Sequence, residues 1–283
     1  MMYLDLHIHS TASDGELSPL EILDIASTKN FSMVSITDHD SVNGYDSLDA
    51  ASFSGVLLPG VELSANLGEE RMHILGYGID PFDSTLRDTL EQIRRFRFER
   101  QEKLIAAMHR EGFEISEEDI LLESEGGVPG RPHIAAAMVR KGMVKTVKDA
   151  FDLYLDNPDS SLYIEKRRIE AKEAIALIQN AGGVAVCAHP LSEKKGKKCL
   201  RTMAIELKEM GIEGLEAFYF RYTPEQTRDC LETAKGLGLF VTAGSDFHGS
   251  RAPDVPSPGM RVPGEAMEPF FTLLENRFGI VPL

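Results

Sequence analysis

The sequence predicts an α/β fold, and roughly seven buried strands favour a TIM-like barrel over an open sheet. Two observations lead to this prediction. Short apolar runs that end in polar or glycine-rich turns recur along the chain, and helical patterns separate most of them. The runs are Tyr3–Ile8, Met33–Ile36, Val56–Val61, Met72–Tyr77, Val184–Ala188, Gly214–Phe218 and Leu239–Ala243.

Start and stop signals mark the helices between these runs. Ser18 precedes a helical pattern over Pro19–Lys29, and Thr223 precedes another over Pro224–Gly236. Serine and threonine commonly accept a hydrogen bond at the start of a helix, and proline is favoured in the first turn. A third pattern, Ala171–Ala181, stops at two glycines. Strands and helices therefore alternate over most of the chain.

The alternation stops between residues 83 and 165, where no strand pattern is needed. We expect residues 1–82 and 166–283 to form the barrel, and residues 83–165 to form a helical insertion that caps the substrate. Apolar residues at helical spacing indicate one long helix, with Leu86, Leu90, Ile93 and Phe96 on one face. Further helical patterns cover Ser116–Glu125, Pro132–Lys141 and Val147–Leu155.

Composition restricts the classes of function. The chain of 283 residues carries a formal net charge of −15, and residues 1–86 alone hold 14 acidic and 2 basic side chains. This acidity argues against a nonspecific surface for long double-stranded nucleic acid. Three cysteines without a C-x-x-C pair argue against a disulfide scaffold or a zinc ribbon. With no basic leader and no apolar stretch that could span a bilayer, we expect a cytoplasmic protein without membrane contact.

The eight histidines are more informative in their placement than in their number. His7 and His9 lie two residues apart on the first strand, so both imidazoles leave the same face. Asp246 and His248 repeat this spacing after the last strand. We expect these side chains to meet at the rim where the carboxyl ends of barrel strands carry active sites. The same rim is expected to hold His39 after the second strand, Glu62 at the end of the third and His189 at the end of the fifth.

A metal centre is the interpretation that this clustering favours. A single histidine in a strand is more often a hydrogen-bonded core or surface residue than a ligand, and one H-x-H pair is ambiguous. His73 interrupts an apolar strand and would need a buried partner, and Asp14 adds a carboxylate. Imidazole and carboxylate ligands without thiolates suit Mn²⁺, Fe²⁺ or Zn²⁺. Because the candidates exceed what one ion uses, we expect two or three divalent ions, with Mn²⁺ foremost.

The order and spacing of these residues resemble the motifs of the PHP (polymerase and histidinol phosphatase) family. The similarity runs from the first strand to the last, with the insertion between. It implies a distorted (β/α)7 barrel, a metal-dependent phosphoesterase activity and a centre of two or three metals. The motifs are His7-Ile8-His9-Ser10, Asp14-Gly15, Ile36-Thr37-Asp38-His39-Asp40, Gly60-Val61-Glu62, Ala188-His189-Pro190 and Gly244-Ser245-Asp246-Phe247-His248-Gly249.

The same resemblance implies how the ligands divide among three metals, with Glu62 bridging two of them. A hydroxide bridging the ions would attack phosphorus in line, and Asp246 or His189 is the candidate that would protonate the leaving oxygen. The first set is His7, His9, Glu62 and Asp246, the second is Glu62, His73 and His189, and the third is Asp14, His39 and His248.

The insertion narrows the branch of the family. Gly130-Arg131-Pro132-His133-Ile134-Ala135 and Glu165-Lys166-Arg167-Arg168 resemble segments of nucleoside 3′,5′-bisphosphate phosphatases and 5′-to-3′ exoribonucleases. Arg131 lies where a loop enters a helix, so its guanidinium and the backbone N–H groups would favour a phosphate. We expect Arg131 to clamp the substrate, with His133, Lys166 and Arg167 as further donors. The alternative is that these are solvated surface residues.

We expect a metal-dependent phosphoesterase that acts on the 3′-phosphate of nucleoside 3′,5′-bisphosphates, or from the 5′ end of short RNA. A histidinol-phosphate phosphatase or another small-molecule phosphomonoesterase is the alternative within this chemistry. A deacylase or amidohydrolase is a different reaction class, and a noncatalytic module that regulates a polymerase is a different role. The run Arg94–Arg100 alternates basic and aromatic residues and could hold single-stranded RNA, although we favour a charged amphipathic helix.

Overall fold

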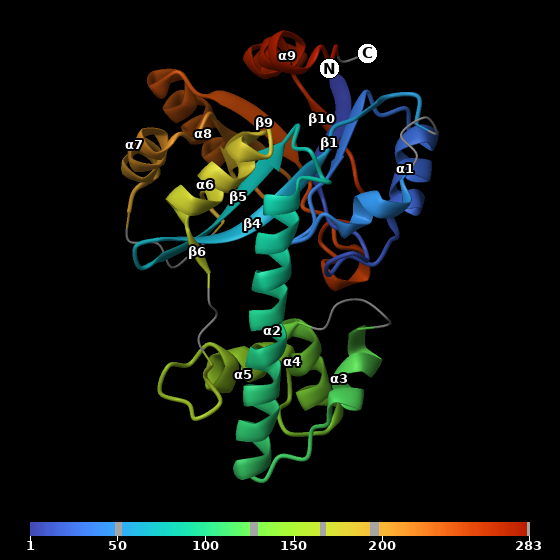
Figure 1. Ribbon diagram of the computed structural model, residues 1–283, viewed down its shortest axis with the longest axis vertical. Helices are drawn as coiled ribbons and strands as arrows, with labels where there is room; N and C mark the ends of the chain where they lie inside the picture. The colour runs from blue at the N-terminus through green and yellow to red at the C-terminus, as the bar shows by residue number, and fades with distance from the viewer. Residues whose placement is uncertain (49–52, 125–129, 165–167, 193–197, 282–283) are drawn as a thin grey trace. The chain divides into compact units, whose positions relative to one another are not determined.

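The computed structural model describes residues 1–48, 53–124, 130–164, 168–192 and 198–281. The chain divides into two compact units, which we call the sheet unit (Met1–Asp88 with Arg168–Leu283) and the helical unit (Thr89–Arg167). The division falls inside helix α2, Ser84–Arg110, which therefore begins in one unit and continues in the other (Figure 1). No helix among the described residues is long and apolar enough to cross a membrane.

The first sheet of the sheet unit has four strands in the order β10-β1-β2-β3. Strands β1, β2 and β3 run parallel, whereas β10 pairs antiparallel with β1. The register of β1 against β2 shifts between Asp5 and Ile8, immediately before the chain reaches the candidate site. The strands are β1 (Met2–Ile8), β2 (Met33–Ile36), β3 (Val56–Leu57) and β10 (Met260–Val262).

The second sheet has six strands in the order β6-β4-β5-β7-β8-β9. Strand β5 runs antiparallel to both of its neighbours, β4 and β7, and the other pairs are parallel. The predicted α/β class is therefore confirmed, with mixed sheets in which β5 and β10 run antiparallel to their neighbours. The strands are β4 (Gly60–Leu67), β5 (Glu70–Tyr77), β6 (Ile169–Glu170), β7 (Val184–Cys187), β8 (Gly214–Tyr219) and β9 (Phe240–Gly244).

The two sheets approach each other at two places without forming one closed sheet in the described residues. A single bridge pairs Ile8 with Phe247 between β1 and the segment after β9, and another pairs His39 with Glu62 between the segment after β2 and β4. The expected closed (β/α)7 barrel is therefore not found as a continuous ladder.

The segment predicted as one strand over Val56–Val61 is two strands. β3 ends at Leu57 and pairs with β2, while β4 starts at Gly60 and pairs with β5 and β6. Pro59 lies between them and has no N–H to donate to a ladder, so a strand is interrupted there. As a result Glu62 lies near the start of a long strand, not at the end of a short one.

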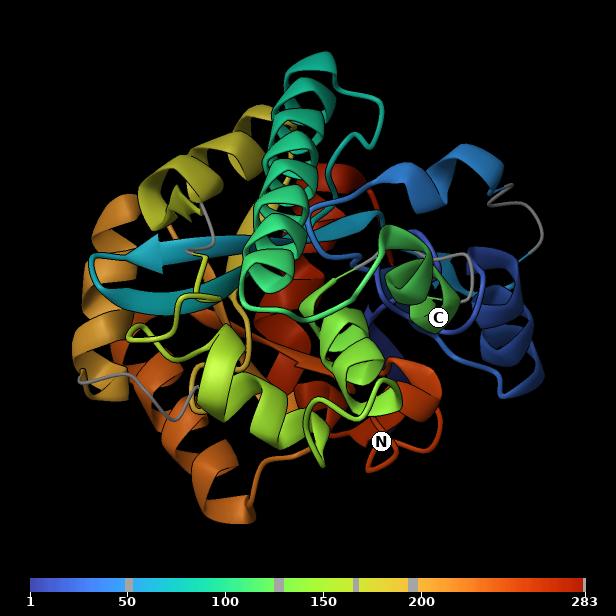
Figure 2. The same cartoon turned by 90° about the horizontal axis from the view of Figure 1, so that it is seen from below.

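The helices of the sheet unit start where the sequence signals them. α1 follows Ser18, whose side chain accepts a hydrogen bond from the Glu21 N–H, and α8 follows Thr223, which does the same for Gln226. Helices α6 to α8, yellow to orange in Figure 2, lie along the outer side of the second sheet. The helices are α1 (Pro19–Thr28), α6 (Ala171–Asn180), α7 (Leu200–Met210), α8 (Pro224–Leu237) and α9 (Gly264–Phe278), with short 3₁₀ turns at Asn43–Ser47 and Gly249–Arg251.

A glycine at the end of β9 allows β1 to approach closely. A Cβ at Gly244 would lie 2.1 Å from the Cβ of His7 and 2.6 Å from Oε1 of Glu216, distances at which no side chain fits. Gly244 therefore brings the strand that carries His7 against the strand that precedes Asp246. This contact joins the two sheets directly beside the candidate site.

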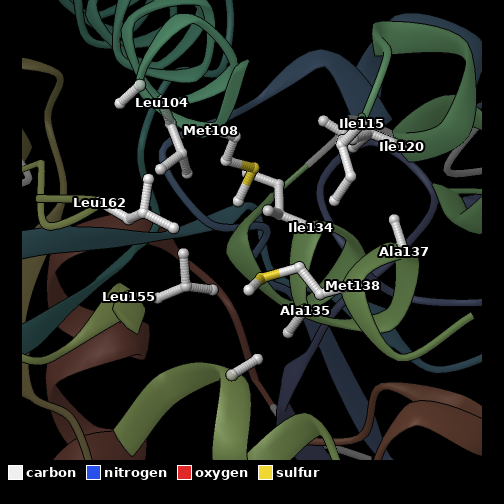
Figure 3. Close-up of a cluster of buried hydrophobic side chains, with 12 residues drawn as sticks. Leu104, Met108, Ile115, Ile120, Ile134, Ala135, Ala137, Met138, Leu155 and Leu162 are labelled. Carbon is white, nitrogen blue, oxygen red and sulfur yellow. The ribbon is translucent and has the colours of Figure 1, made fainter. Parts of the chain in front are cut away.

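The helical unit has a core of its own. α2 is followed by α3, α4, α5 and a single π-helical turn, so the prediction of four helical segments is confirmed. Their buried faces form the cluster in Figure 3, which includes Leu104, Met108, Ile134, Met138 and Leu155. These elements are α2 (Ser84–Arg110), α3 (Glu117–Ser124), α4 (Arg131–Arg140), α5 (Val147–Ala150) and the turn Phe151–Leu155.

Candidate metal centre

The centre is built around Glu62, whose side chain is fully buried in β4. Its two carboxylate oxygens face five imidazoles, so one carboxylate connects residues from four different segments of the chain. This crowding lowers the pKa of Glu62 well below its usual value, although burial alone would raise it. The contacts are His7 at 3.3 Å, His9 at 3.3 Å, His39 at 2.7 Å, His73 at 3.0 Å and His189 at 3.0 Å.

The end of β1 contributes two imidazoles to one face, as their spacing predicts. His7 and His9 are both fully buried, and their Nε2 atoms lie 3.2 Å apart. Between them, Ile8 is buried towards the opposite side and pairs with β2. The alternation of a strand thus converts the H-x-H spacing into two nitrogens that converge on the same small volume.

Asp246 closes the centre from the turn after β9. Its Oδ1 lies 3.4 Å from His7 Nε2, 3.2 Å from His9 Nε2 and 3.5 Å from His248 Nδ1. Its backbone N–H donates to the His7 carbonyl at 2.8 Å, and its φ of 57° lies in the left-handed region. His189 has a φ of 26° in the same region. Such conformations are costly for residues other than glycine and persist where the surroundings hold them.

Asp14 and His248 form the more exposed side of the centre, with His9 and His39. Asp14 Oδ1 lies 3.5 Å from His248 Nε2 and 3.7 Å from His9 Nδ1. The loop that carries Asp14 is held by the buried Asp38, which accepts hydrogen bonds from the Ser10 N–H and from the hydroxyls of two serines. Asp38 thus acts next to His39 as a support of the loop.

His73 reaches the centre from the first half of β5. It was expected to need a buried partner, and that partner is Glu62. Because β5 runs antiparallel to β4 and β7, its first half lies at the level where the parallel strands end. Across the ladder, His73 pairs with Ser64, two residues beyond Glu62 on β4. The reversal of one strand therefore brings a residue from mid-strand to the same rim.

All of the predicted ligands come together in four overlapping groups. Within each group, one ligand atom from every residue lies within 4.8 Å of the others. The sharing of residues between groups makes them one continuous cluster. The groups are His9, Asp14, His39 and His248; His7, His9 and Asp246; His7, Glu62 and His189; and His39, Glu62 and His73.

The donor atoms fit divalent cations better than they fit one another. His9 Nδ1, His39 Nδ1, His73 Nδ1 and Glu62 Oε2 are buried and make no hydrogen bond within the described residues. Buried polar atoms normally find such a partner. Nitrogen and oxygen atoms that converge without hydrogen-bond geometry are the arrangement expected around metal ions of borderline hardness.

The surroundings raise the pKa of some imidazoles in the cluster and lower the pKa of others. Burial opposes the charged form throughout, but Glu216 and Glu62 raise the pKa of His7 well above its usual value, and Asp246 and Glu62 raise that of His9 to about 10. By contrast, burial and neighbouring His9 lower the pKa of His248 to about 4. A cation bound here would take over the stabilising charge that a proton provides to His7 and His9.

One participant was missed from the sequence. Glu216 in β8 is fully buried; its Oε1 accepts from His7 Nδ1 at 2.9 Å and its Oε2 from the His189 N–H at 2.7 Å. Because Glu216 binds Nδ1 of His7, the Nε2 atom faces the cluster. A carboxylate behind a metal-bound imidazole orients the ring in the same way. The available signal was a glutamate inside the apolar run Gly214–Tyr219.

Two of the predicted substrate residues, Arg131 and His133, lie in the helical unit. Arg131 is the first residue of α4; its Nη1 pairs with Asp156 at 2.5 Å, and its guanidinium lies over the Phe151 ring. His133 is buried, and its Nδ1 accepts from the Gly130 N–H at 2.7 Å, which caps the start of α4. Lys166 and Arg167 lie outside the described residues.

The run Arg94–Arg100 lies on α2. Arg94 and Arg95 both approach Glu91, at 3.7 and 3.5 Å, and the Arg94 guanidinium lies over the Phe98 ring. These pairs along one helix agree with the charged amphipathic helix that we favoured.

Comparison with known proteins finds relatives along most of the chain, although no family model matches. A 3′,5′-nucleoside bisphosphate phosphatase from Chromobacterium violaceum is 31% identical over 251 residues, which cover 88% of each chain. A 5′-3′ exoribonuclease from Haemophilus influenzae is 31% identical over 246 residues, which cover 86% of this chain and 89% of the relative.

Solved structures give the same fold. A protein from Bifidobacterium adolescentis, described as a metal-dependent phosphoesterase, is 31% identical with a TM-score of 0.76 over 88% of this chain and 89% of its own. A protein from C. violaceum, described as an amidohydrolase with bound sulfate, is 29% identical with a TM-score of 0.81 over 97% of this chain and 96% of its own.

Proposed function

We propose, from the premise that this chain belongs to the PHP family of metal-dependent phosphoesterases, that it hydrolyses phosphate esters of small nucleotides. The observation that carries the proposal is the convergence of five imidazoles on the buried Glu62, with Asp246 beside them. The preferred substrates are nucleoside 3′,5′-bisphosphates, cleaved at the 3′-phosphate, and short 5′-phosphorylated RNA, degraded from its 5′ end. These substrates correspond to the names of the two relatives, a 3′,5′-nucleoside bisphosphate phosphatase and a 5′-3′ exoribonuclease.

The cluster would hold two or three divalent ions, with Mn²⁺ as our first choice and Fe²⁺ or Zn²⁺ as alternatives. Such ions supply Lewis acidity towards the phosphoryl oxygens and an acidified water as nucleophile. We assign Glu62 as the shared carboxylate because both of its oxygens face imidazoles. By the family resemblance the ligands would be His7, His9, Glu62 and Asp246; Glu62, His73 and His189; and Asp14, His39 and His248. The observed groups contain the same nine residues, but they place His73 with His39 and Glu62, and His189 with His7 and Glu62.

Asp246 and His189 are our candidates for proton transfer during the reaction. Asp246 directs Oδ1 into the cluster, and His189 connects Glu62 through Nε2 with the Ser192 hydroxyl through Nδ1 at 2.8 Å. We propose that one of these residues relays a proton to the leaving oxygen. Asp246→Asn keeps the size of the side chain and removes its proton-accepting charge, so a fall in kcat at retained metal content would identify Asp246.

In our proposal the helical unit would supply cationic contacts to the substrate phosphate. We propose that Arg131 exchanges its partner Asp156 for a substrate phosphate, since a guanidinium binds both anions by the same planar pair of donors. His133, Lys166 and Arg167 would add donors. In this proposal the insertion, residues 83–165 by its sequence pattern, acts as the substrate cap of the barrel formed by residues 1–82 and 166–283.

We infer further that the two sheets form one distorted barrel. The bridges Ile8–Phe247 and His39–Glu62 each pair one sheet with the other; the first lies beside predicted ligands, and the second joins two of them. In such an arrangement the centre would occupy the rim at which parallel strands end, where barrel enzymes place their active sites.

The proposed reaction is tested with four substrates offered to purified Mn²⁺-loaded protein. Adenosine 3′,5′-bisphosphate, a 5′-phosphorylated oligoribonucleotide, histidinol phosphate and an N-acyl amino acid are incubated separately, and product release is measured. We expect turnover of one or both nucleotide substrates. Turnover of histidinol phosphate alone would contradict the nucleotide substrate and identify a histidinol-phosphate phosphatase. Turnover of the N-acyl amino acid alone would identify a deacylase.

The metal centre has its own test. His9→Ala removes an imidazole that belongs to two of the four groups, so metal content and activity should be lost together. Metal is counted by elemental analysis after gel filtration. A wild-type protein that binds no divalent ion and turns over none of the substrates would favour the noncatalytic module.

A further inference from the structure

We propose that the end of β8 and the turn after it, Tyr219–Tyr222, position the metal centre from outside without binding a metal. This inference rests on the proposed metal centre. Strand β8 contributes none of the candidate ligands, yet the segment touches Asp246 and the loop of His189. We call Tyr219, Arg221 and Tyr222 the outer clamp.

The outer clamp acts first on Asp246. Oδ1 of this carboxylate faces the imidazoles of the cluster, whereas Oδ2 faces outward. The Tyr219 hydroxyl donates to Oδ2 at 2.8 Å, and Arg221 Nη1 donates to the same oxygen at 3.0 Å. With Oδ2 occupied by two donors, the carboxylate is left to bind a cation through Oδ1 alone.

Arg221 is itself fixed. Its Nε donates to Asp254 Oδ2 at 2.5 Å and its Nη2 to Asp254 Oδ1 at 3.3 Å, while Nη1 also donates to the Tyr219 hydroxyl at 2.7 Å. The guanidinium therefore bridges two carboxylates through separate N–H groups, an arrangement that a lysine cannot reproduce. Because Asp254 holds Arg221 in position, Arg221 in turn limits the movement of the Asp246 carboxylate.

The outer clamp also holds the loop of His189. The Tyr219 ring lies 5.3 Å from the His189 ring, and Tyr222 packs edge-on against Tyr219 at 5.0 Å. The Leu191 N–H donates to the Tyr222 hydroxyl at 2.6 Å. These contacts fix the chain on the C-terminal side of His189.

Both residues that the outer clamp holds have a backbone in the left-handed region. The φ of His189 is 26° and that of Asp246 is 57°. Neither is a glycine, so each conformation costs free energy that neighbouring contacts must offset. The outer clamp supplies such contacts to both, which explains why a segment without ligands has hydroxyls and a guanidinium at this position.

Arg221→Met tests the proposal, because it keeps most of the aliphatic chain and removes the guanidinium. We expect the dissociation constant for Mn²⁺, measured by competition with a chromophoric chelator, to rise about 10- to 100-fold, as for other partners behind metal ligands. In the Co²⁺-substituted protein, the visible absorption bands should shift because the coordination of Asp246 changes.

The matched control is Arg277→Met. Arg277 makes a similar two-pronged pair with Glu213, at 3.1 and 2.8 Å, immediately before the other end of β8. It faces no candidate ligand, so metal affinity and the Co²⁺ bands should remain those of the wild type. A general loss of stability in β8 would affect both variants, whereas the outer clamp affects Arg221 alone.

Tyr219→Phe is the second variant, in case Arg221→Met does not fold. It removes one hydrogen bond to Asp246 and retains the ring, so we expect a weakened Mn²⁺ affinity with the same sense of Co²⁺ band shift. Wild-type metal affinity and spectrum in folded Arg221→Met, or in folded Tyr219→Phe, would overturn the outer clamp while leaving the metal centre in place. A wild-type protein that binds no divalent ion would overturn both.

Discussion

At the scale of single residues, a buried carboxylate inside an apolar strand is the feature that organises this site. Glu62 and Glu216 both interrupt apolar runs and are both fully buried. Charged side chains are rarely buried without partners, so each marks a position where the fold assembles compensating groups. Glu62 gathers five imidazoles, and Glu216 fixes the orientation of one of them.

Replacing Glu216 tests the orientation of His7. Glu216→Gln preserves the size of the side chain but removes the charge that stabilises the His7 Nδ1–H, so Mn²⁺ affinity should fall about 10- to 100-fold. Isothermal titration with Mn²⁺ measures it. Glu213→Gln, three residues earlier in the chain and paired with Arg277, is the control and should leave affinity unchanged. Unchanged affinity in folded Glu216→Gln would show that the imidazole needs no such support.

Arg131 provides the residue-scale test of substrate binding. Arg131→Ala should leave metal content intact and raise KM for the nucleotide substrate about 10-fold or more, because a charge-assisted pair with phosphate is lost. Steady-state kinetics measure it. Arg140→Ala is matched, since Arg140 lies on the same helix and also pairs with carboxylates, at 2.6 and 3.0 Å. Wild-type kinetics in Arg131→Ala would eliminate the phosphate clamp.

At the scale of elements, local signals located the helices well and the strand directions poorly. Ser18 and Thr223 mark the starts of α1 and α8, because helix capping depends on residues only three positions apart. The direction of β5 was not predictable in this way, since an apolar run has the same pattern in a parallel and an antiparallel pair. The short turn between β4 and β5 joins antiparallel neighbours.

The contact of α3 with α4 gives a pH-dependent prediction. Asp119 accepts from Lys141 Nζ at 2.8 Å, from the Ser116 N–H and from Arg140, and these contacts hold its pKa below the usual range. A lowered folded-state pKa contributes stability above the unfolded-state value of about 4, and this contribution is lost as the pH falls through the lowered pKa.

Asp119→Asn should therefore lower the melting temperature at pH 7 and change it progressively less as the pH falls below about 4. Thermal unfolding is followed by circular dichroism at both ends of this range. Asp152→Asn is the control, because Asp152 belongs to an exposed pair with Lys148 four residues away on the same helical segment. An equal effect of Asp119→Asn at both pH values would contradict a charge-based role.

At the scale of the whole molecule, the net charge of −15 does not describe the proposed metal centre, where bound ions would make the local charge more positive. Glu62, Asp246 and Asp14 belong to the acidic total, but in the proposed centre they bind cations. Two or three divalent ions would add four to six positive charges at this cluster, which makes a small phosphate ester a suitable ligand of an acidic protein. The acidic composition thus argues against a surface that binds long nucleic acid, but it is compatible with binding the end of a short strand.

Removing the metal should lower the stability of the sheet unit, which holds the candidate ligands, more than that of the helical unit. Ions that bind only the folded sheet unit stabilise it by about 2.7 kcal/mol at a concentration of 100 times the dissociation constant. We expect chelation to lower a melting transition of the wild type in differential scanning calorimetry. His9→Ala, which cannot bind metal fully, should show little response to the chelator. Identical melting curves for the wild type with and without chelator would contradict a stabilising metal centre.

The sequence by itself determined the types of ligand, the shared face of His7 and His9 and the capped helices, because strand alternation and helix capping act between near neighbours. Only the tertiary structure decided that β5 is antiparallel, that Glu216 stands behind His7 and that Arg221 holds the outer oxygen of Asp246. His7 and Glu216 are 209 residues apart in the chain, and Asp246 and Arg221 are 25 apart. No local pattern encodes such pairs, because they form only when separate strands pack side by side.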